Sequence, residues 1–81
     1  MTNREKLRDL LIDVFLLEDD EFDFSLTQEQ IETWDSLGTV SMAVGLEEAF
    51  GHHMTPEQAV EVESIQGIID YLTSCGVSFA D

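Results

Sequence analysis

Apolar residues recur at helical spacing near the start of the chain. The spacing i, i+3, i+4, i+7 and i+10 describes Leu7, Leu10, Leu11, Val14 and Leu17. Residues at this spacing form one stripe along an α-helix. Thr2 or Asn3 can cap such a helix. The pattern therefore predicts a first helix that runs to about Leu17.

A long polar stretch, residues 18–35, follows this helix and predicts a loop. Phe22 lies within the acidic run of this stretch, Phe24 directly follows the run, and Trp34 lies near the end of the stretch. A loop of this length in a compact domain needs to be tied down. We expect the three aromatic side chains to anchor it on the core. Residues 27–30 resemble a capping box and predict a short turn.

Three more helices are predicted after the loop. Asp35 can cap one from Ser36 to about Phe50, closed by Gly51. Thr55 followed by Pro56 is a start signal for a short helix that ends near residues 61–63. Ser64 can cap the last helix, whose inward residues are Ile65, Ile68, Ile69 and Leu72. With no strand pattern, the sequence predicts an all-α fold, a small four-helix bundle with a short third helix and a long first loop, as a single domain over residues 1–81.

The net charge is −15, and its distribution matters more than its size. The three basic residues are Arg4, Lys6 and Arg8, and every one of the 18 carboxylates except Glu5 follows them. Nucleic acid and anionic membranes would be repelled by this chain, whereas a basic protein surface would be attracted. No apolar run approaches the roughly 18 residues of a membrane span, no signal peptide is evident, and Cys75 has no second cysteine to pair with. We therefore expect a cytoplasmic monomer.

The helix predicted over residues 36–50 has two distinct faces. On a helical projection one arc suffices as a core face, and it comprises Thr39, Met42, Ala43, Leu46, Ala49 and Phe50. The other arc mixes apolar and acidic residues and comprises Ser36, Leu37, Val40, Val44, Glu47 and Glu48. Leu37, Val40 and Val44 could anchor a partner protein, with the two glutamates as charged guides. Alternatively, the short third helix covers this arc and both faces are buried.

Ser36 stands at the start of this helix, directly after the cap Asp35. Free N–H groups and the helix dipole favour an anion at such a position, and a phosphodiester on Ser36 would meet that preference. A serine there can also be simply a good first residue for a helix.

The segment Asp35-Ser36-Leu37-Gly38-Thr39-Val40, followed at the same helical offset by Leu46-Glu47-Glu48-Ala49-Phe50, resembles the acyl carrier protein family. Residues 65–72 resemble the last helix of that family. The resemblance implies that a phosphopantetheinyl transferase attaches 4'-phosphopantetheine from coenzyme A to Ser36. The thiol of this arm would carry acyl groups as thioesters to fatty-acid, lipid or polyketide-type biosynthetic enzymes.

The resemblance also assigns roles to residues around Ser36. Basic patches on partner enzymes would dock on the acidic second helix, where the expected recognition residues are Asp35, Leu37, Val40, Val44, Glu47 and Glu48. The acyl chain would lie between helices, lined by Met42, Leu46, Phe50, Ala59, Val62, Ile65 and Ile68. Gly38 and Ser41 replace acidic residues usual in fatty-acid carriers, which favours a stand-alone carrier of a specialised pathway. Gly38 and Gly45 also predict a looser second helix.

Two other functions stay open from the sequence. The chain could be a D-alanyl or other aminoacyl carrier, or, from another class, an acidic interaction module that targets a basic partner. Enzymatic activity is not expected, because Ser36 has no evident base or oxyanion site. No metal site is expected either, since His52 and His53 are adjacent and have no cysteine nearby.

Overall fold

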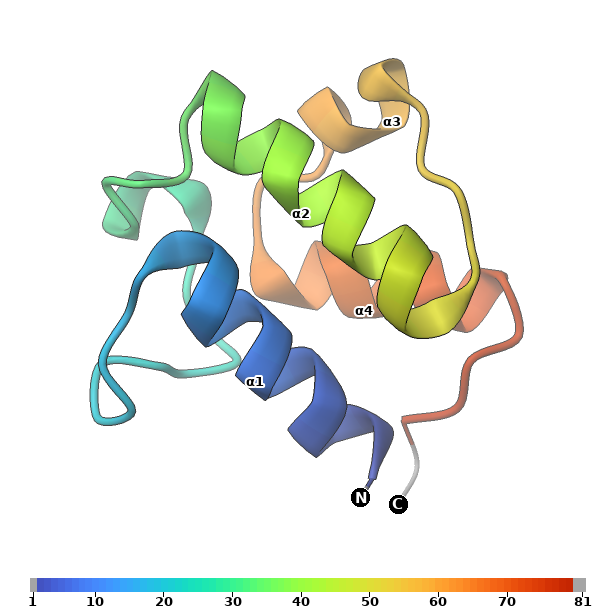
Figure 1. Ribbon diagram of the computed structural model, residues 1–81, viewed down its shortest axis with the longest axis horizontal. Coiled ribbons are helices and arrows are strands. Elements are labelled where there is room, and N and C mark those ends of the chain that lie inside the picture. Colours follow the sequence, from blue (N-terminus) through green and yellow to red (C-terminus); the bar gives the residue numbers. More distant parts are fainter. Residues whose placement is uncertain (1, 80–81) are drawn as a thin grey trace.

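The computed structural model describes residues 2–79, which contain four α-helices and no strand (Figure 1). The helices are α1 (Asn3–Phe15), α2 (Ser36–Phe50), α3 (Pro56–Glu61) and α4 (Ile65–Ser74), and a short 3₁₀ turn, η1 (Gln28–Gln30), interrupts the connection before α2. The expected all-α class is thus confirmed. No helix in this part of the chain is long and apolar enough to cross a membrane.

Each α-helix begins at a side-chain cap, as the sequence predicts. The capping oxygen accepts a hydrogen bond from the backbone N–H three residues later in all four helices, at Thr2, Asp35, Thr55 and Ser64. These bonds satisfy N–H groups that have no partner within the helix. The starts of the helices are therefore determined locally, before any tertiary contact is considered.

The end of α1 differs from the prediction. The helix ends at Phe15, because Leu16 adopts a left-handed conformation (φ 56°) and its side chain is 80% exposed. The fully buried face is Leu7, Leu11 and Phe15, whereas Leu10, Val14 and Leu17 are only partly buried. The predicted stripe did not include Phe15, which follows Val14. Spacing alone does not show which of two adjacent apolar residues points into the core.

Phe15 meets Trp34, the last aromatic residue before α2. The two rings stack with their centroids 4.9 Å apart and an angle of 24° between their planes. Trp34 is buried, and its indole N–H finds no hydrogen-bond partner in the described structure. Apolar stacking therefore holds this ring in place, and it joins the end of α1 to the start of α2.

The connection between α1 and α2 is anchored, as expected from its aromatic residues. Phe22 and Phe24 contact each other edge to face, with centroids 5.0 Å apart, and pack against the core. Beyond them, the backbone N–H of Gln28 donates to the carbonyl of Glu63 and the N–H of Ile65 donates to the carbonyl of Leu26. These bonds tie η1 and its neighbours to the start of α4.

The three basic side chains all lie over phenylalanine rings. Arg4 lies over Phe24, Lys6 over Phe50 and Arg8 over Phe22, at 5.5, 4.9 and 5.9 Å from the ring centroids. A cation over an aromatic face is attracted by the negative face of the ring. The basic side chains at the start of α1 thereby pack on the connection between α1 and α2 and on the end of α2.

Two glycines allow α2 to lie close to its neighbours. A Cβ atom at Gly38 would collide with the carbonyl oxygen of Thr33, well inside the 3.0 Å that Cβ atoms essentially never cross. At Gly45 it would lie 2.7 Å from the end of the Leu10 side chain on α1. Both glycines thus have a packing role that their low helix propensity alone does not reveal.

Candidate functional site at the start of the second helix

Ser36 is the first residue of α2, and its side chain is exposed. The carboxylate of the preceding residue, Asp35, accepts a hydrogen bond of 2.9 Å from the N–H of Gly38. The carbonyl of Asp35 accepts the N–H of Thr39 at 2.8 Å. Asp35 thus fixes the first turn of the helix, and Ser36 presents its hydroxyl to solvent at the positive end of the helix dipole.

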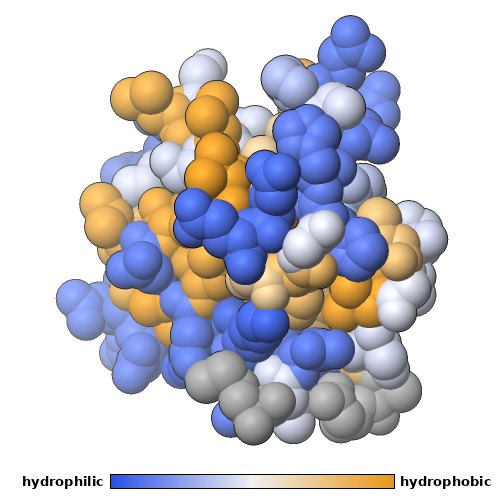
Figure 2. Space-filling model, turned by 45° about the vertical axis from the view of Figure 1, so that its right-hand side comes forward, coloured by the Kyte–Doolittle hydropathy of each residue, from blue (hydrophilic) through white to orange (hydrophobic). Residues whose placement is uncertain are grey.

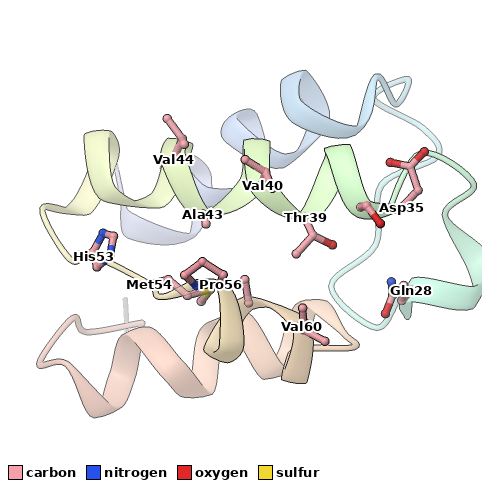
Figure 3. A pocket seen from close by; sticks show the side chains of 12 residues that line it. Gln28, Asp35, Thr39, Val40, Ala43, Val44, His53, Met54, Pro56 and Val60 are labelled. Atoms are coloured by element: carbon pink, nitrogen blue, oxygen red, sulfur yellow. The ribbon is translucent and has the colours of Figure 1, made fainter.

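A groove of about 600 Å³ lies between α2 and α3, and Ser36 is one of its lining residues. Figure 3 shows Asp35, the residue before Ser36, and Gln28 at one end and His53 at the other, with Thr39 and Ala43 on the α2 side and Met54, Pro56 and Val60 opposite. Val40, Val44 and Ala59 complete the lining. Any group attached to the hydroxyl of Ser36 therefore begins at the mouth of this groove.

Small residues and a short helix leave this space open. Ala43 on α2 and Ala59 on α3 line the groove with methyl groups only, and Ala59 is nearly fully buried. The helix α3 has six residues and is too short to cover α2 along its length. Val60, which also lines the groove, is 69% exposed. The groove is therefore an apolar surface feature and not a closed cavity.

The outer face of α2 is not covered by α3. Leu37, Val40 and Val44 are 79%, 60% and 49% exposed, so the alternative in which the bundle buries both faces is wrong for these residues. The carboxylates of Asp35, Glu47 and Glu48 are also exposed. Figure 2 shows hydrophobic atoms that reach the surface between hydrophilic ones on one side of the molecule. An apolar patch next to carboxylates is thus available at the predicted partner face.

Most of the predicted acyl-lining residues form the closed core. Met42, Leu46, Ile65 and Ile68 are fully buried, and Phe50 and Val62 pack against the core at partial burial. Only Ala59 of the seven lines the groove. The groove residues that sequence reasoning did not assign to a site are Gln28, Thr39, Ala43, His53, Met54, Pro56 and Val60. They come from separate segments of the chain and carry no common periodic signal, although Pro56 stands at the first position of α3.

His53 is held from two sides at the far end of the groove. Its Nδ1 lies 3.5 Å from a carboxylate oxygen of Glu47 on α2, and its carbonyl accepts a 2.7 Å hydrogen bond from the hydroxyl of Tyr71 on α4. Burial raises the pKa of Tyr71, and the neighbouring Cys75 adds to this shift. Tyr71 therefore stays a protonated donor to His53 at neutral pH. Within residues 2–79, no group of three or more His, Cys, Asp or Glu side chains is placed to hold a metal ion.

No protein-family model matches the chain. Function must therefore be inferred from the site itself. The features that bear on it are the exposed hydroxyl of Ser36, the apolar groove that begins there and the acidic, partly apolar face of α2.

Proposed function

We propose that this chain is a phosphopantetheine-dependent carrier protein of the acyl carrier type, with its four helices arranged as a bundle and Ser36 as the attachment site. The observation that supports this most strongly is the position of Ser36. Its exposed hydroxyl lies on the first turn of α2, at the mouth of an apolar groove of about 600 Å³. A tethered arm with an apolar cargo needs both an accessible attachment atom and an adjacent apolar surface.

The chemistry of attachment suits this position. A phosphopantetheinyl transferase would join the Ser36 hydroxyl to the phosphopantetheine part of coenzyme A as a phosphodiester, with loss of the nucleotide part. The resulting anion would lie at the N-terminus of α2, where free N–H groups and the dipole favour it. The carboxylate of Asp35 opposes it only weakly, because it is exposed to water and occupied by the N–H of Gly38. The chain itself would catalyse no reaction and would be the substrate of the transferase.

The proposed partners are enzymes that load or process the acyl group and that present basic surfaces. Leu37, Val40 and Val44 offer an exposed apolar strip on α2, and Glu47 and Glu48 add exposed carboxylates beside it. The three Lys and Arg side chains are on α1 and lie over phenylalanine rings of the connection and of the end of α2. The arrangement favours approach of a basic protein along α2 and disfavours nucleic acid and anionic membranes. The cargo would be presented to fatty-acid, lipid or polyketide-type biosynthetic enzymes.

The test is intact mass after incubation with coenzyme A, Mg²⁺ and a broad-specificity phosphopantetheinyl transferase. We expect the mass of one phosphopantetheinyl group to be gained, and no gain in Ser36→Ala. Ser41→Ala is the matched control, because Ser41 is an exposed serine on the same helix. It should be modified like the unaltered chain.

Failure of the folded chain to gain this mass, beside a carrier that is modified under the same conditions, would contradict the proposal. The acidic interaction module would then become the better explanation. Gain in Ser36→Ala but not in Ser41→Ala would move the attachment site and equally contradict the assignment.

A further inference from the structure

We infer that Gln28 is a positioning residue for the attachment reaction at Ser36: its side-chain amide fixes the segment that leads into α2 and so sets the direction of the serine hydroxyl. The inference rests on the proposed function, because it concerns the reaction by which Ser36 would gain its arm. In that reaction the hydroxyl oxygen of Ser36 bonds to the phosphorus that carries pantetheine. The bond from this phosphorus to the nucleotide part of coenzyme A breaks and releases adenosine bisphosphate, and the hydroxyl proton passes to a base of the transferase.

Gln28 lies in η1 and joins two segments that are far apart in the sequence. Its backbone N–H donates to the carbonyl of Glu63 at 2.7 Å, next to the cap of α4, and its side-chain Nε2 donates to the carbonyl of Trp34 at 3.0 Å. Figure 3 shows Gln28 at the same end of the groove as Asp35, and Ser36 lines this groove as well. The start of α4 is thereby linked, through one residue, to the peptide bond that enters Asp35.

The turn that carries Gln28 is itself held in place. In its capping box the backbone N–H of Thr27 donates to Oε1 of Gln30 at 2.9 Å. Beside the backbone bond of Gln28, the N–H of Ile65 donates to the carbonyl of Leu26 at 3.1 Å. The side chain of Gln28 therefore extends from a backbone that hydrogen bonds fix on both sides.

Other contacts hold the fold around the bond between Gln28 and Trp34. Trp34 is buried and stacks on Phe15, and Asp35 caps the first turn of α2. The bond from Gln28 adds the orientation of the peptide unit between Trp34 and Asp35, whose carbonyl it holds at a partly buried position. The direction of the Ser36 hydroxyl depends on this orientation, and attack at phosphorus requires aligned reacting atoms. Loss of the bond should therefore slow the chemical step while the chain stays folded.

The experiment uses Gln28→Met, because methionine is similar to glutamine in length and shape and has no N–H to donate. Transfer of phosphopantetheine from coenzyme A by the broad-specificity transferase is followed by intact mass over time. Several concentrations of the chain give kcat and KM. We expect kcat to fall about fivefold and KM to stay unchanged, because one hydrogen bond is lost and the exposed face of α2 is intact. Urea unfolding checks that the variant is folded at the assay temperature.

Two further variants make the test specific. Gln66→Met is the matched control: Gln66 is exposed on α4 and its amide donates to the carboxylate of Asp70 at 3.0 Å, and neither residue lines the groove. This control loses a hydrogen bond through the same side-chain change and should keep both kcat and KM. Gln28→Glu keeps the size of the side chain but has a carboxylate in place of the donor, which repels the carbonyl of Trp34. It should lower kcat at least as much as Gln28→Met.

An unchanged kcat in Gln28→Met would overturn the inference. A raised KM with unchanged kcat would overturn it too, because Gln28 would then contact the transferase instead. Loss of folding in both variants at Gln28 would equally overturn it, since the residue would then serve the fold and not the site. These results concern the variants alone, so the proposed function would stand. If the unaltered chain gains no mass, the proposed function is wrong and this inference falls with it.

Discussion

Replacing Gly38 with alanine should destabilise the fold, although alanine is the better helix former. Gly38 lies in the first turn of α2, and a Cβ atom there would overlap the carbonyl oxygen of Thr33 and lie 3.4 Å from the ring of Phe15. The carbonyl belongs to the backbone, so it cannot rotate away like a side chain. Either α2 or the segment before it must move.

The two opposing effects can be compared. Alanine gains at most about 1 kcal/mol over glycine in a helix interior. Forcing extra atoms into a packed site costs about 1–3 kcal/mol, and a backbone obstacle places the cost at the upper end of that range. The net loss should be about 2 kcal/mol, which lowers Tm by about 10 °C for a chain of this size. Gly45→Ala should stay within about 1 kcal/mol of the unaltered chain, because the atom it meets, 2.7 Å away, is the end of the partly buried Leu10 side chain and can turn aside.

Urea unfolding followed by the fluorescence of Trp34 measures both variants, since this tryptophan is unique in the chain and buried against Phe15. The slope of the transition should be unchanged and its midpoint lower for Gly38→Ala. A Gly38→Ala protein as stable as the unaltered chain would refute the packing argument. It would instead favour the sequence-based hypothesis that this glycine merely loosens α2.

Three further predictions concern the cap, the connection and the core. Asp35→Ala should lower the free energy of unfolding, measured in urea, by about 1 kcal/mol, whereas Asp35→Asn should lower it much less, because a carboxylate or an amide oxygen can accept the N–H of Gly38. Equal losses in the two variants would mean that the charge of Asp35 matters and its capping bond does not. The backbone N–H and hydroxyl of Ser25 hold the pKa of Asp23 below 3.8, so this carboxylate stabilises the fold above that pH and the contribution is lost as pH falls through the lowered pKa. Asp23→Asn should therefore show a smaller fall in Tm between about pH 5 and pH 2, and an unchanged pH profile would argue against it. Phe15→Ala removes a fully buried ring and should cost about 3–5 kcal/mol, seen as a largely unfolded fluorescence signal without urea; a cooperative transition near that of the unaltered chain would contradict this.

The boundaries of the helices were largely predictable because their signals are local. A cap acts on N–H groups two or three residues away, so Asp35, Thr55 and Ser64 could be read directly as starts. Gly51 adopts the left-handed conformation expected at the end of α2. The position of Ser36 at the first turn, and hence its exposure, follows from the same local rules.

The groove was not predictable, because it depends on how elements pack. Met42 and Leu46 share a helical face with Ala43, yet of these three only Ala43 lines the groove. Met42 and the adjacent Ala43 differ because the side chain of Met42 points into the core and that of Ala43 points toward α3. His53 and Met54 precede α3 in a segment without periodicity, so nothing in their spacing indicated that they border the groove. The exposure of Leu37 likewise depends on the length of α3, a property of another segment.

The two ends of the described chain lie side by side (Figure 1), and this has a practical consequence. The side chain of Asn3 donates to the carbonyl of Ser78 at 2.8 Å, and that of Arg4 donates to the carbonyl of Phe79 at 3.0 Å. A domain whose two ends lie close together at the surface can be inserted into a loop of another protein. It also tolerates circular permutation, in which the two ends are joined and new ends are made elsewhere. The first turn of α2 lies at the opposite end of the molecule in Figure 1. A tag, a surface tether or a host protein attached at this junction would therefore leave the neighbourhood of Ser36 unobstructed.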